Sequence, residues 1–145
     1  MAKFNKSKFK SENQNWETPD EIFVPLNREF QFTLDVCASK ENKKCEKYFD
    51  IESNGLTKDW KNEICWMNPP FGEQGKWVKK AYEQSQNENS IVVCLLSART
   101  NTNWWHDYCM KGEIRFIRGR PTFKGAKYGL PQPLAIVIFK PFLKT

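Results

Sequence analysis

The stretch Glu63-Ile64-Cys65-Trp66-Met67-Asn68-Pro69-Pro70-Phe71 joins an apolar segment to two consecutive prolines. Its apolar part suits a β-strand that is buried on both faces, as strands of parallel sheets are. Each proline lacks a backbone N–H and favours extended geometry in the residue before it, so the strand must end at Asn68. The sequence therefore predicts a rigid amide at the carboxyl end of an internal strand, which is where open α/β sheets bind ligands.

Two interpretations of these prolines are open from the residues alone. Asn-Pro and Pro-Pro pairs are common in ordinary loops, so the segment also suits a plain turn. The apolar strand before it favours a ligand site, because such a strand lies inside a sheet rather than at its edge. An amide held there presents a carbonyl acceptor and an amine donor, and Phe71 can offer its ring face to a flat partner.

The segments on either side alternate between strand and helix patterns. Residues 90–96 are continuously apolar and rich in β-branched side chains, which is typical of a central parallel strand. Further strands are expected at residues 32–38, 113–118 and 134–140. Helices are expected at residues 18–30, 75–86 and 103–110, the first with Thr18 as its cap and with a kink or an early end at Pro25. This alternation predicts an α/β fold with a compact, open, mostly parallel sheet and an antiparallel late strand.

The length and charge of the chain narrow the organisation further. The 145 residues are the length of one domain, with residues 1–15 as a flexible basic arm and residues 16–145 as the folded part. No stretch is large enough for a separate target-recognition domain. A net charge of +6 favours polyanionic partners such as nucleic acid, as supporting information only.

The cysteines and the hydropathy indicate the compartment. Five cysteines without Cys-x-x-Cys spacing predict neither a disulfide framework nor a zinc site. No long apolar run suits a membrane span, and the first residues lead into no signal-peptide core. We therefore expect a cytoplasmic protein, in a bacterium or a phage-infected host cell, with no membrane and no metal among its partners.

Several segments together resemble the small phage-type DNA N-6-adenine-methyltransferases of the Dam class. In chain order they are Trp16-Glu17-Thr18-Pro19, Leu34-Asp35-Val36-Cys37-Ala38, Asn54-Gly55-Leu56, Asn68-Pro69-Pro70-Phe71 and Gly119-Arg120-Pro121-Thr122-Phe123. The Asn-Pro-Pro-Phe element is specific to amino-methyltransfer, and the Trp-x-Thr-Pro start narrows the resemblance to the phage group. It covers roughly residues 16–140 and implies a Rossmann-like methyltransferase fold that uses S-adenosylmethionine.

The implied reaction moves a methyl group from S-adenosylmethionine to the exocyclic amino group of adenine in DNA. The resemblance assigns proton acceptance from that amine to the side-chain carbonyl of Asn68 and the backbone carbonyl of Pro69. It implies that Pro70 shapes the turn and that Phe71 stacks on a base extruded from the double helix. Cytosine or a protein glutamine are alternative substrates, and a catalytically inactive DNA-binding module of the same fold is the non-enzymatic alternative.

The resemblance also implies a set of cofactor-binding residues. They are Trp16, Thr18, Pro19, Asp35, Cys37, Ala38, Asn54, Leu56 and Asn68. In this set Asp35, Cys37 and Ala38 surround the methionine part of the cofactor. The chain departs from the wider family here, because Ala38-Ser39-Lys40 stands where a glycine-rich loop is usual.

Basic residues on the late loops are candidates for contact with double-stranded DNA. They are Arg99, Arg118, Arg120, Lys124 and Lys127. A solvated charged face is the alternative interpretation. Because the chain is short, sequence recognition falls to the basic arm, the loop after Pro70 and residues 119–133, or else to a second subunit in a homodimer.

Overall fold

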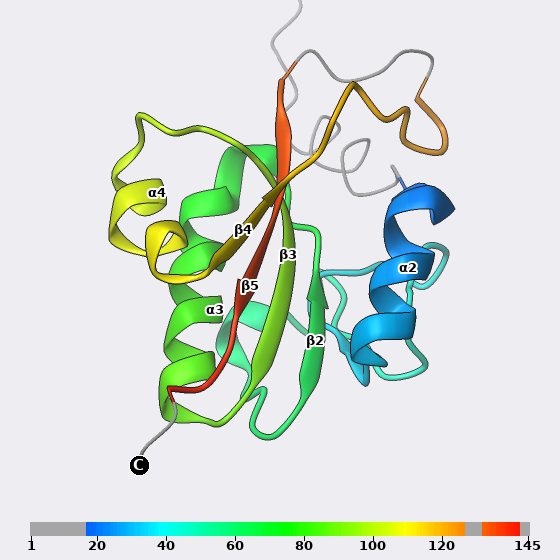
Figure 1. Ribbon diagram of the computed structural model, residues 1–145. Coiled ribbons are helices and arrows are strands. Elements are labelled where there is room, and N and C mark those ends of the chain that lie inside the picture. Colours follow the sequence, from blue (N-terminus) through cyan, green and yellow to red (C-terminus); the bar gives the residue numbers. More distant parts are fainter. Residues whose placement is uncertain (1–16, 127–131, 143–145) are drawn as a thin grey trace, which may run out of the picture.

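A single open sheet organises the protein. The computed structural model describes residues 17–126 and 132–142. The five strands lie in the order β1-β2-β3-β5-β4 (Figure 1). Their bounds are β1 Leu34–Asp35, β2 Ile64–Met67, β3 Ile91–Ser97, β4 Glu113–Phe116 and β5 Leu134–Phe139.

The strand directions bring four carboxyl ends to one edge of the sheet. β1 pairs with β2, and β2 with β3, in parallel, whereas β5 is antiparallel to both β3 and β4. Because β5 runs against both of its neighbours, β4 runs in the direction of β1, β2 and β3. This edge, called the motif edge below, is therefore where the residues after these four strands emerge.

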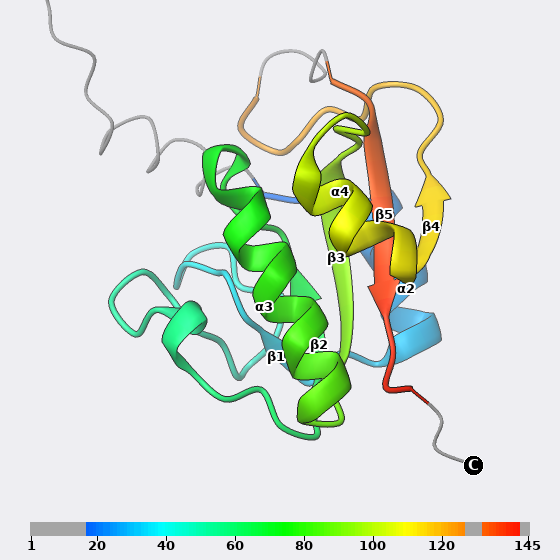
Figure 2. The same ribbon diagram turned by 90° about the vertical axis from the view of Figure 1, so that its left-hand side faces the viewer.

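Helices cover both faces of the sheet. The helix α2 (Asp20–Phe30) lies on one face, and α3 (Gln74–Asn87) with α4 (Asn103–Asp107) lies on the other (Figures 1 and 2). Three short 3₁₀ helices complete the described secondary structure: η1 (Gly55–Thr57), η2 (Phe71–Glu73) and η3 (Cys109–Lys111). The α/β class and the mixed, mostly parallel sheet expected from the sequence are confirmed.

The two sheet faces carry separate apolar clusters because side chains alternate along each strand. In β2, Cys65 and Met67 belong to the cluster under α3 and α4, whereas Trp66 belongs to the cluster under α2. In β3, Val92 and Val93 divide in the same way. Both central strands are buried on both faces, as their sequences predicted.

Several sequence-based boundaries were wrong. The first strand was expected at 32–38 but has only two residues, since Val36 and the residues after it enter a loop. The early end at Pro25 does not occur, and α2 continues to Phe30, the end expected for the whole helix. Pro25 is exposed, so water can reach the carbonyl that its missing N–H leaves unpaired. The helix expected at 103–110 divides into α4 and η3.

The basic arm predicted at residues 1–15 lies outside the described residues, as does Trp16. Within the described part of the chain, no helix is both long enough and apolar enough to cross a lipid bilayer.

Candidate functional site at the motif edge

The parallel strands bring together predicted site residues that are far apart in the sequence. Asp35 ends β1, Asn68 directly follows β2, and Ser97 ends β3. The register aligns Asp35 with Trp66 and Met67 with Cys94, so the strand ends lie side by side. The motif edge therefore joins the predicted catalytic stretch to the predicted cofactor-binding strand.

The Asn-Pro-Pro-Phe motif is anchored at its middle and partly open at its ends. Pro69 and Pro70 are buried, whereas Asn68 and Phe71 are half-buried. The carbonyl of Pro70 accepts the backbone N–H of Glu73 at 3.0 Å, which starts η2 directly after the motif. The ring of Phe71 packs against the apolar cluster under α2, so one part of the ring is already engaged.

Residues 17–20, called the strap below, lie across this edge and are held on both sides. Glu17 exchanges two backbone hydrogen bonds with Lys124, at 3.2 and 2.9 Å. On the other side the amine of Lys44 donates to the carboxylate of Glu17 at 2.9 Å and to the carbonyl of Thr18 at 3.3 Å. The strap is therefore fixed by two segments that follow it by about 25 and 105 positions in the chain.

The role expected for Thr18 as a helix cap was wrong. The residue that caps α2 is Pro19, and no side chain makes a capping hydrogen bond there. The Thr18 side chain is buried, and its hydroxyl oxygen accepts a hydrogen bond of 3.0 Å from the amide nitrogen of Asn68. The strap thus contacts the catalytic motif directly.

Asp35 is buried, and backbone N–H groups hold its carboxylate. One oxygen accepts from Cys37 at 3.3 Å and the other from Lys44 at 3.0 Å. Burial raises the pKa of Asp35 to about 6, although these two bonds and the Lys44 charge act in the opposite direction. A carboxylate in this setting gains from a nearby cation, because the cation offsets the cost of burying a negative charge.

The segment at residues 54–56 reaches the same region. Asn54 adopts a left-handed conformation with φ 55°, and its side-chain oxygen accepts from the backbone N–H of Leu56 at 3.2 Å. The side chain of Asn54, which the resemblance includes among the cofactor-binding residues, therefore has a local partner. Gly55 approaches the carbonyl of Val36 so closely that a Cβ at position 55 would lie 2.2 Å from that oxygen.

Gly55 supplies the close backbone approach that the sequence lacks directly after β1. The indole N–H of Trp60 donates to its carbonyl at 2.9 Å, which fixes the segment in place. Cys37 and Leu56 are half-buried against the same apolar cluster, on either side of this contact. Burial raises the pKa of the Cys37 thiol, so this side chain stays neutral and apolar. Ala38 follows it and is half-buried as well.

Gln74, which was missed from the sequence alone, links the motif to β3. Its side chain is buried, its amide nitrogen donates to the carbonyl of Phe71 at 3.1 Å, and its oxygen accepts from the backbone N–H of Ser97 at 2.7 Å. The Ser97 hydroxyl in turn donates to Gln132 at 3.0 Å. A polar residue directly before the helix predicted at residues 75–86, three residues after the motif, is the signal that was available. Nothing in the sequence around Lys44 indicated its contacts with the strap.

The predicted DNA-binding residues separate into two groups. Arg99, Arg118 and Arg120 are exposed, and among the residues that the structure describes none of them forms an ion pair. Lys124 instead pairs with Asp20 at 3.0 Å and lies 3.8 Å from Glu17. Lys127 lies outside the described residues.

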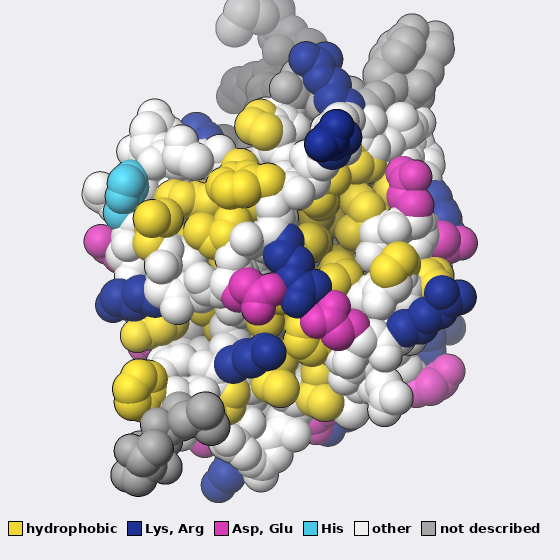
Figure 3. All heavy atoms as spheres, viewed as in Figure 1, with side chains coloured by type: hydrophobic (Ala, Val, Ile, Leu, Met, Phe, Trp, Pro, Cys, Tyr) yellow, Lys and Arg dark blue, Asp and Glu magenta, His cyan; other side chains and the backbone are white. Residues whose placement is uncertain are grey.

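Arg115, on β4, is a basic residue whose charge is paired with carboxylates. Its guanidinium donates to both carboxylate oxygens of Glu29 at 2.8 Å and to Glu113 at 2.5 Å, and these partners raise its pKa. Figure 3 shows touching basic and acidic side chains in the middle of this face, and basic ones at its top centre. Arg99, Arg118 and Arg120, in contrast to Arg115, follow β3 and β4 at the motif edge and have no carboxylate partner among the described residues.

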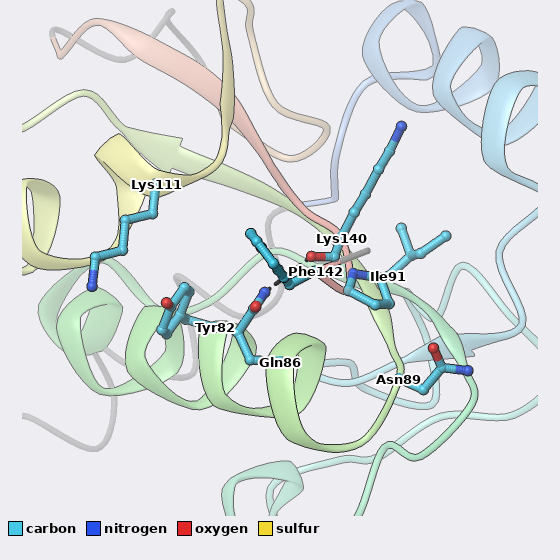
Figure 4. A pocket seen from close by; sticks show the side chains of 8 residues that line it. Tyr82, Gln86, Asn89, Ile91, Lys111, Lys140 and Phe142 are labelled. Atoms are coloured by element: carbon cyan, nitrogen blue, oxygen red, sulfur yellow. Dashed lines mark hydrogen bonds between the residues drawn. The ribbon is translucent and has the colours of Figure 1, made fainter. Parts of the chain in front are cut away.

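A cavity of about 930 Å³ lies at the opposite edge of the sheet, between α3 and the end of β5 (Figure 4). Tyr82 and Gln86 line it, and Gln86 donates to the carbonyl of Lys140 at 3.0 Å. The Lys140 side chain extends away from it, and its amine lies 5.9 Å from the ring centre of Phe30. Because Ile91 begins β3 at this end, the cavity is remote from Asn68.

The described part of the chain also lacks any group of three His, Cys, Asp or Glu side chains placed to hold a metal ion.

Comparison with known proteins assigns this arrangement to a family. The profile of the family described as DNA N-6-adenine-methyltransferase (Dam) matches residues 6–144. The chain is 34% identical to the DNA N-6-adenine-methyltransferase of Haemophilus phage HP1, across 97% of this chain and 86% of that protein. It is 41% identical to the DNA N-6-adenine-methyltransferase of Escherichia phage T1, across 62% of this chain and 38% of that protein. The chain therefore belongs to the DNA N-6-adenine-methyltransferase (Dam) family.

Proposed function

We propose that this protein transfers a methyl group from S-adenosylmethionine to the exocyclic amino group of adenine in double-stranded DNA. The observation that carries the proposal is the position of Asn68 at the end of a buried parallel strand, beside the end of β1 that bears Asp35, in a chain of this family. The names of the phage relatives favour adenine over cytosine or a protein side chain as the acceptor.

The amine of adenine is a weak nucleophile because its lone pair is delocalised into the ring. An acceptor placed against one amine hydrogen lets the nitrogen become pyramidal and form the new N–C bond while the bond between sulfur and the methyl carbon breaks. The proton that the amine loses passes to water. The side-chain carbonyl of Asn68 suits this role, because its amide nitrogen is bound to Thr18 and its oxygen is directed elsewhere. We assign the second acceptor to the backbone carbonyl of Pro69, which has no ionisable group to titrate.

Pro70 and Phe71 help to position the adenine base. Pro70 is buried and caps η2, so it fixes the position of Phe71, the first residue of η2. The exposed part of the Phe71 ring is available to stack on an extruded base. Stacking of this kind contributes about 1–3 kcal/mol per base, which offsets part of the cost of unpairing.

The residues around the end of β1 fit the proposed cofactor in their chemistry. When bound, S-adenosylmethionine supplies an electrophilic methyl group on sulfur. The carboxylate of Asp35 would hold its ammonium group, and the neutral Cys37 with Ala38 and Leu56 would contact its apolar parts. Thr18, which is bound to Asn68, its neighbour Pro19, and Asn54, which precedes Gly55 and Leu56, would border this region.

DNA contact is assigned to the exposed arginines at the motif edge. Arg99 follows β3, and Arg118 and Arg120 follow β4, so all three emerge at the edge that bears Asn68. Contacts to phosphates position a protein on DNA without reading its sequence. Lys124 contributes instead by holding the strap, because its amine already pairs with Asp20.

The test is methyl transfer from labelled S-adenosylmethionine to unmethylated duplex DNA, comparing the wild-type protein with Asn68→Ala. Loss of one transition-state hydrogen bond is expected to lower kcat by roughly 10²–10³-fold. Asn87→Ala, at the far end of α3, is the matched control and should leave kcat unchanged.

Digestion of the product to nucleosides identifies the labelled base. Label in N6-methyladenine supports the proposal. Label in cytosine, or in protein alone, contradicts the assigned substrate. A protein that binds no S-adenosylmethionine in calorimetry contradicts the enzymatic function as a whole.

A further inference from the structure

We infer that Thr18 is the positioning residue that orients the Asn68 amide, so that its carbonyl oxygen faces the acceptor amine. This role rests on the proposed function and differs from the cofactor contact that the sequence suggested for Thr18. It is carried by the hydrogen bond of 3.0 Å that the amide nitrogen of Asn68 donates to the Thr18 hydroxyl oxygen.

The orientation of the amide determines whether Asn68 can act as a proton acceptor. An asparagine side chain has a donor end and an acceptor end of almost equal shape, so steric fit alone does not select between its two orientations. If the amide were reversed, its NH₂ group would face the amine of adenine, and two donors would oppose each other. In the structure the NH₂ end donates to the Thr18 hydroxyl oxygen, which is the productive orientation, and this bond holds the amide there.

The Asn68 backbone cannot correct a reversed side chain. Asn68 directly follows β2, whose pairing to β1 and β3 fixes the strand, and the two buried prolines fix the residues after it. Rotation of the side chain is consequently the freedom that remains at this position. A single well-placed partner is enough to remove it.

Thr18 is held well enough to serve as that partner. Its side chain is only 2% exposed, and its carbonyl accepts from the amine of Lys44 at 3.3 Å. The residue before it is paired to Lys124 by two backbone hydrogen bonds, and the residue after it caps α2. Thr18 is thus fixed from both flanks, although it is 50 positions away from Asn68 in the chain.

The same bond strengthens the acceptor. Donation from the amide nitrogen shifts electron density toward the carbonyl oxygen, and linked hydrogen bonds polarise one another at a site of low dielectric constant. Thr18 therefore acts on the reaction through Asn68 and has no need to touch the substrate.

The kinetic test compares Thr18→Val with Thr18→Ser. Valine keeps the shape and removes the acceptor oxygen, so kcat for DNA methylation should fall about tenfold, the equivalent of one ordinary hydrogen bond. The KM for S-adenosylmethionine should stay within about twofold. Serine keeps the oxygen and should restore kcat to near the wild-type value. A wild-type kcat in Thr18→Val, or a change confined to the KM for S-adenosylmethionine, would overturn the role.

A second measurement observes the bond without turnover. The side-chain NH₂ resonances of Asn68 are assigned in ¹H–¹⁵N spectra by their absence from Asn68→Ala. They should shift in Thr18→Val and stay near their wild-type position in Thr18→Ser. Unchanged resonances in Thr18→Val overturn the inference even if kcat falls, because the loss then has another cause.

The two proposals fail in different ways. If the wild-type protein methylates cytosine instead of adenine, the proposed substrate is wrong, but the ratio of Thr18→Val to wild-type kcat keeps its meaning. If the wild-type protein transfers no methyl group to any acceptor, both the proposed function and the positioning role are wrong. If Thr18→Val has a normal kcat and unshifted Asn68 resonances, only the positioning role of Thr18 is wrong.

Discussion

Gly55 and Val36 meet so closely that a Cβ on residue 55 would lie 2.2 Å from the carbonyl oxygen of residue 36. This contact fixes the segment at 54–56 against the chain that leaves β1, in the place where the sequence offers no glycine-rich loop. The glycine needed for close approach is thus present, but it comes from a position about 20 residues further along.

We predict that Gly55→Ala destabilises the protein by about 1–3 kcal/mol, the usual range for overpacking. The obstructing atom belongs to the backbone and cannot rotate away, so the segment must move as a whole. Urea unfolding measures the change. Gly72→Ala is the control, because a Cβ there would meet nothing within 4 Å and should change stability by less than about 0.5 kcal/mol. Equal stability of the two variants would contradict the contact.

Gln74→Met should destabilise the protein and lower methyl transfer together. Both ends of the Gln74 amide are used, so methionine leaves the carbonyl of Phe71 and the backbone N–H of Ser97 without their partners. Each unpaired buried group costs about 1–3 kcal/mol. Thermal unfolding and initial rates measure the two effects. Lys79→Met, on the exposed side of the same helix, should affect neither. A fully stable Gln74→Met variant would show that water replaces the side chain.

The affinity for S-adenosylmethionine should rise with pH until the pH exceeds about 6. Burial raises the pKa of Asp35 to about 6, so at pH 5 its carboxyl is mostly protonated and cannot attract an ammonium group. The α-amino group of the ligand stays mostly charged between pH 5 and pH 7, because its ordinary pKa is about 8. Since only the ionised carboxylate attracts the ligand, affinity should increase about tenfold from pH 5 to pH 7 and then level off.

Calorimetry at several pH values measures this dependence. Asp35→Asn should bind weakly and with little change over the same range. Asp107→Asn, an exposed substitution on α4, should keep the wild-type profile. A wild-type affinity that does not change between pH 5 and pH 7 would rule out Asp35 as the group that holds the ammonium.

Arg118→Gln and Arg120→Gln should each weaken DNA binding at low salt. Each exposed arginine that contacts a phosphate contributes about one unit to the slope of log affinity against log salt concentration, so each variant should reduce that slope by about 1. Fluorescence anisotropy with a labelled duplex measures the slopes.

Arg115→Gln is the matched control for these variants. Its guanidinium is bound by Glu29 and Glu113, so its loss should leave the salt slope unchanged. If Arg115→Gln reduced the slope as much as Arg118→Gln, the ion pairs of β4 would open when DNA binds, and the division between paired and free arginines would not describe the complex.

The central strands and the catalytic motif could be predicted because their signals are local. A buried parallel strand needs a continuous apolar run, as in Ile64–Met67 and Ile91–Ser97, and a double proline ends it whatever surrounds it. The short β1 and the division between α4 and η3 could not be predicted. Their bounds depend on hydrogen bonds from other segments, such as those between Asp35 and residues 47 and 49.

The sequence by itself determined the α/β class, the end of β2 at Asn68 and the kind of chemistry that an amide can perform there. Only the tertiary structure decided which groups surround that amide. Thr18 contacts Asn68, Gly55 contacts the chain after β1, and Gln74 contacts Ser97 through pairings between distant segments, and no local pattern specifies such pairings. The orientation of a side chain depends on the partner that folding brings to it, and here that partner is Thr18.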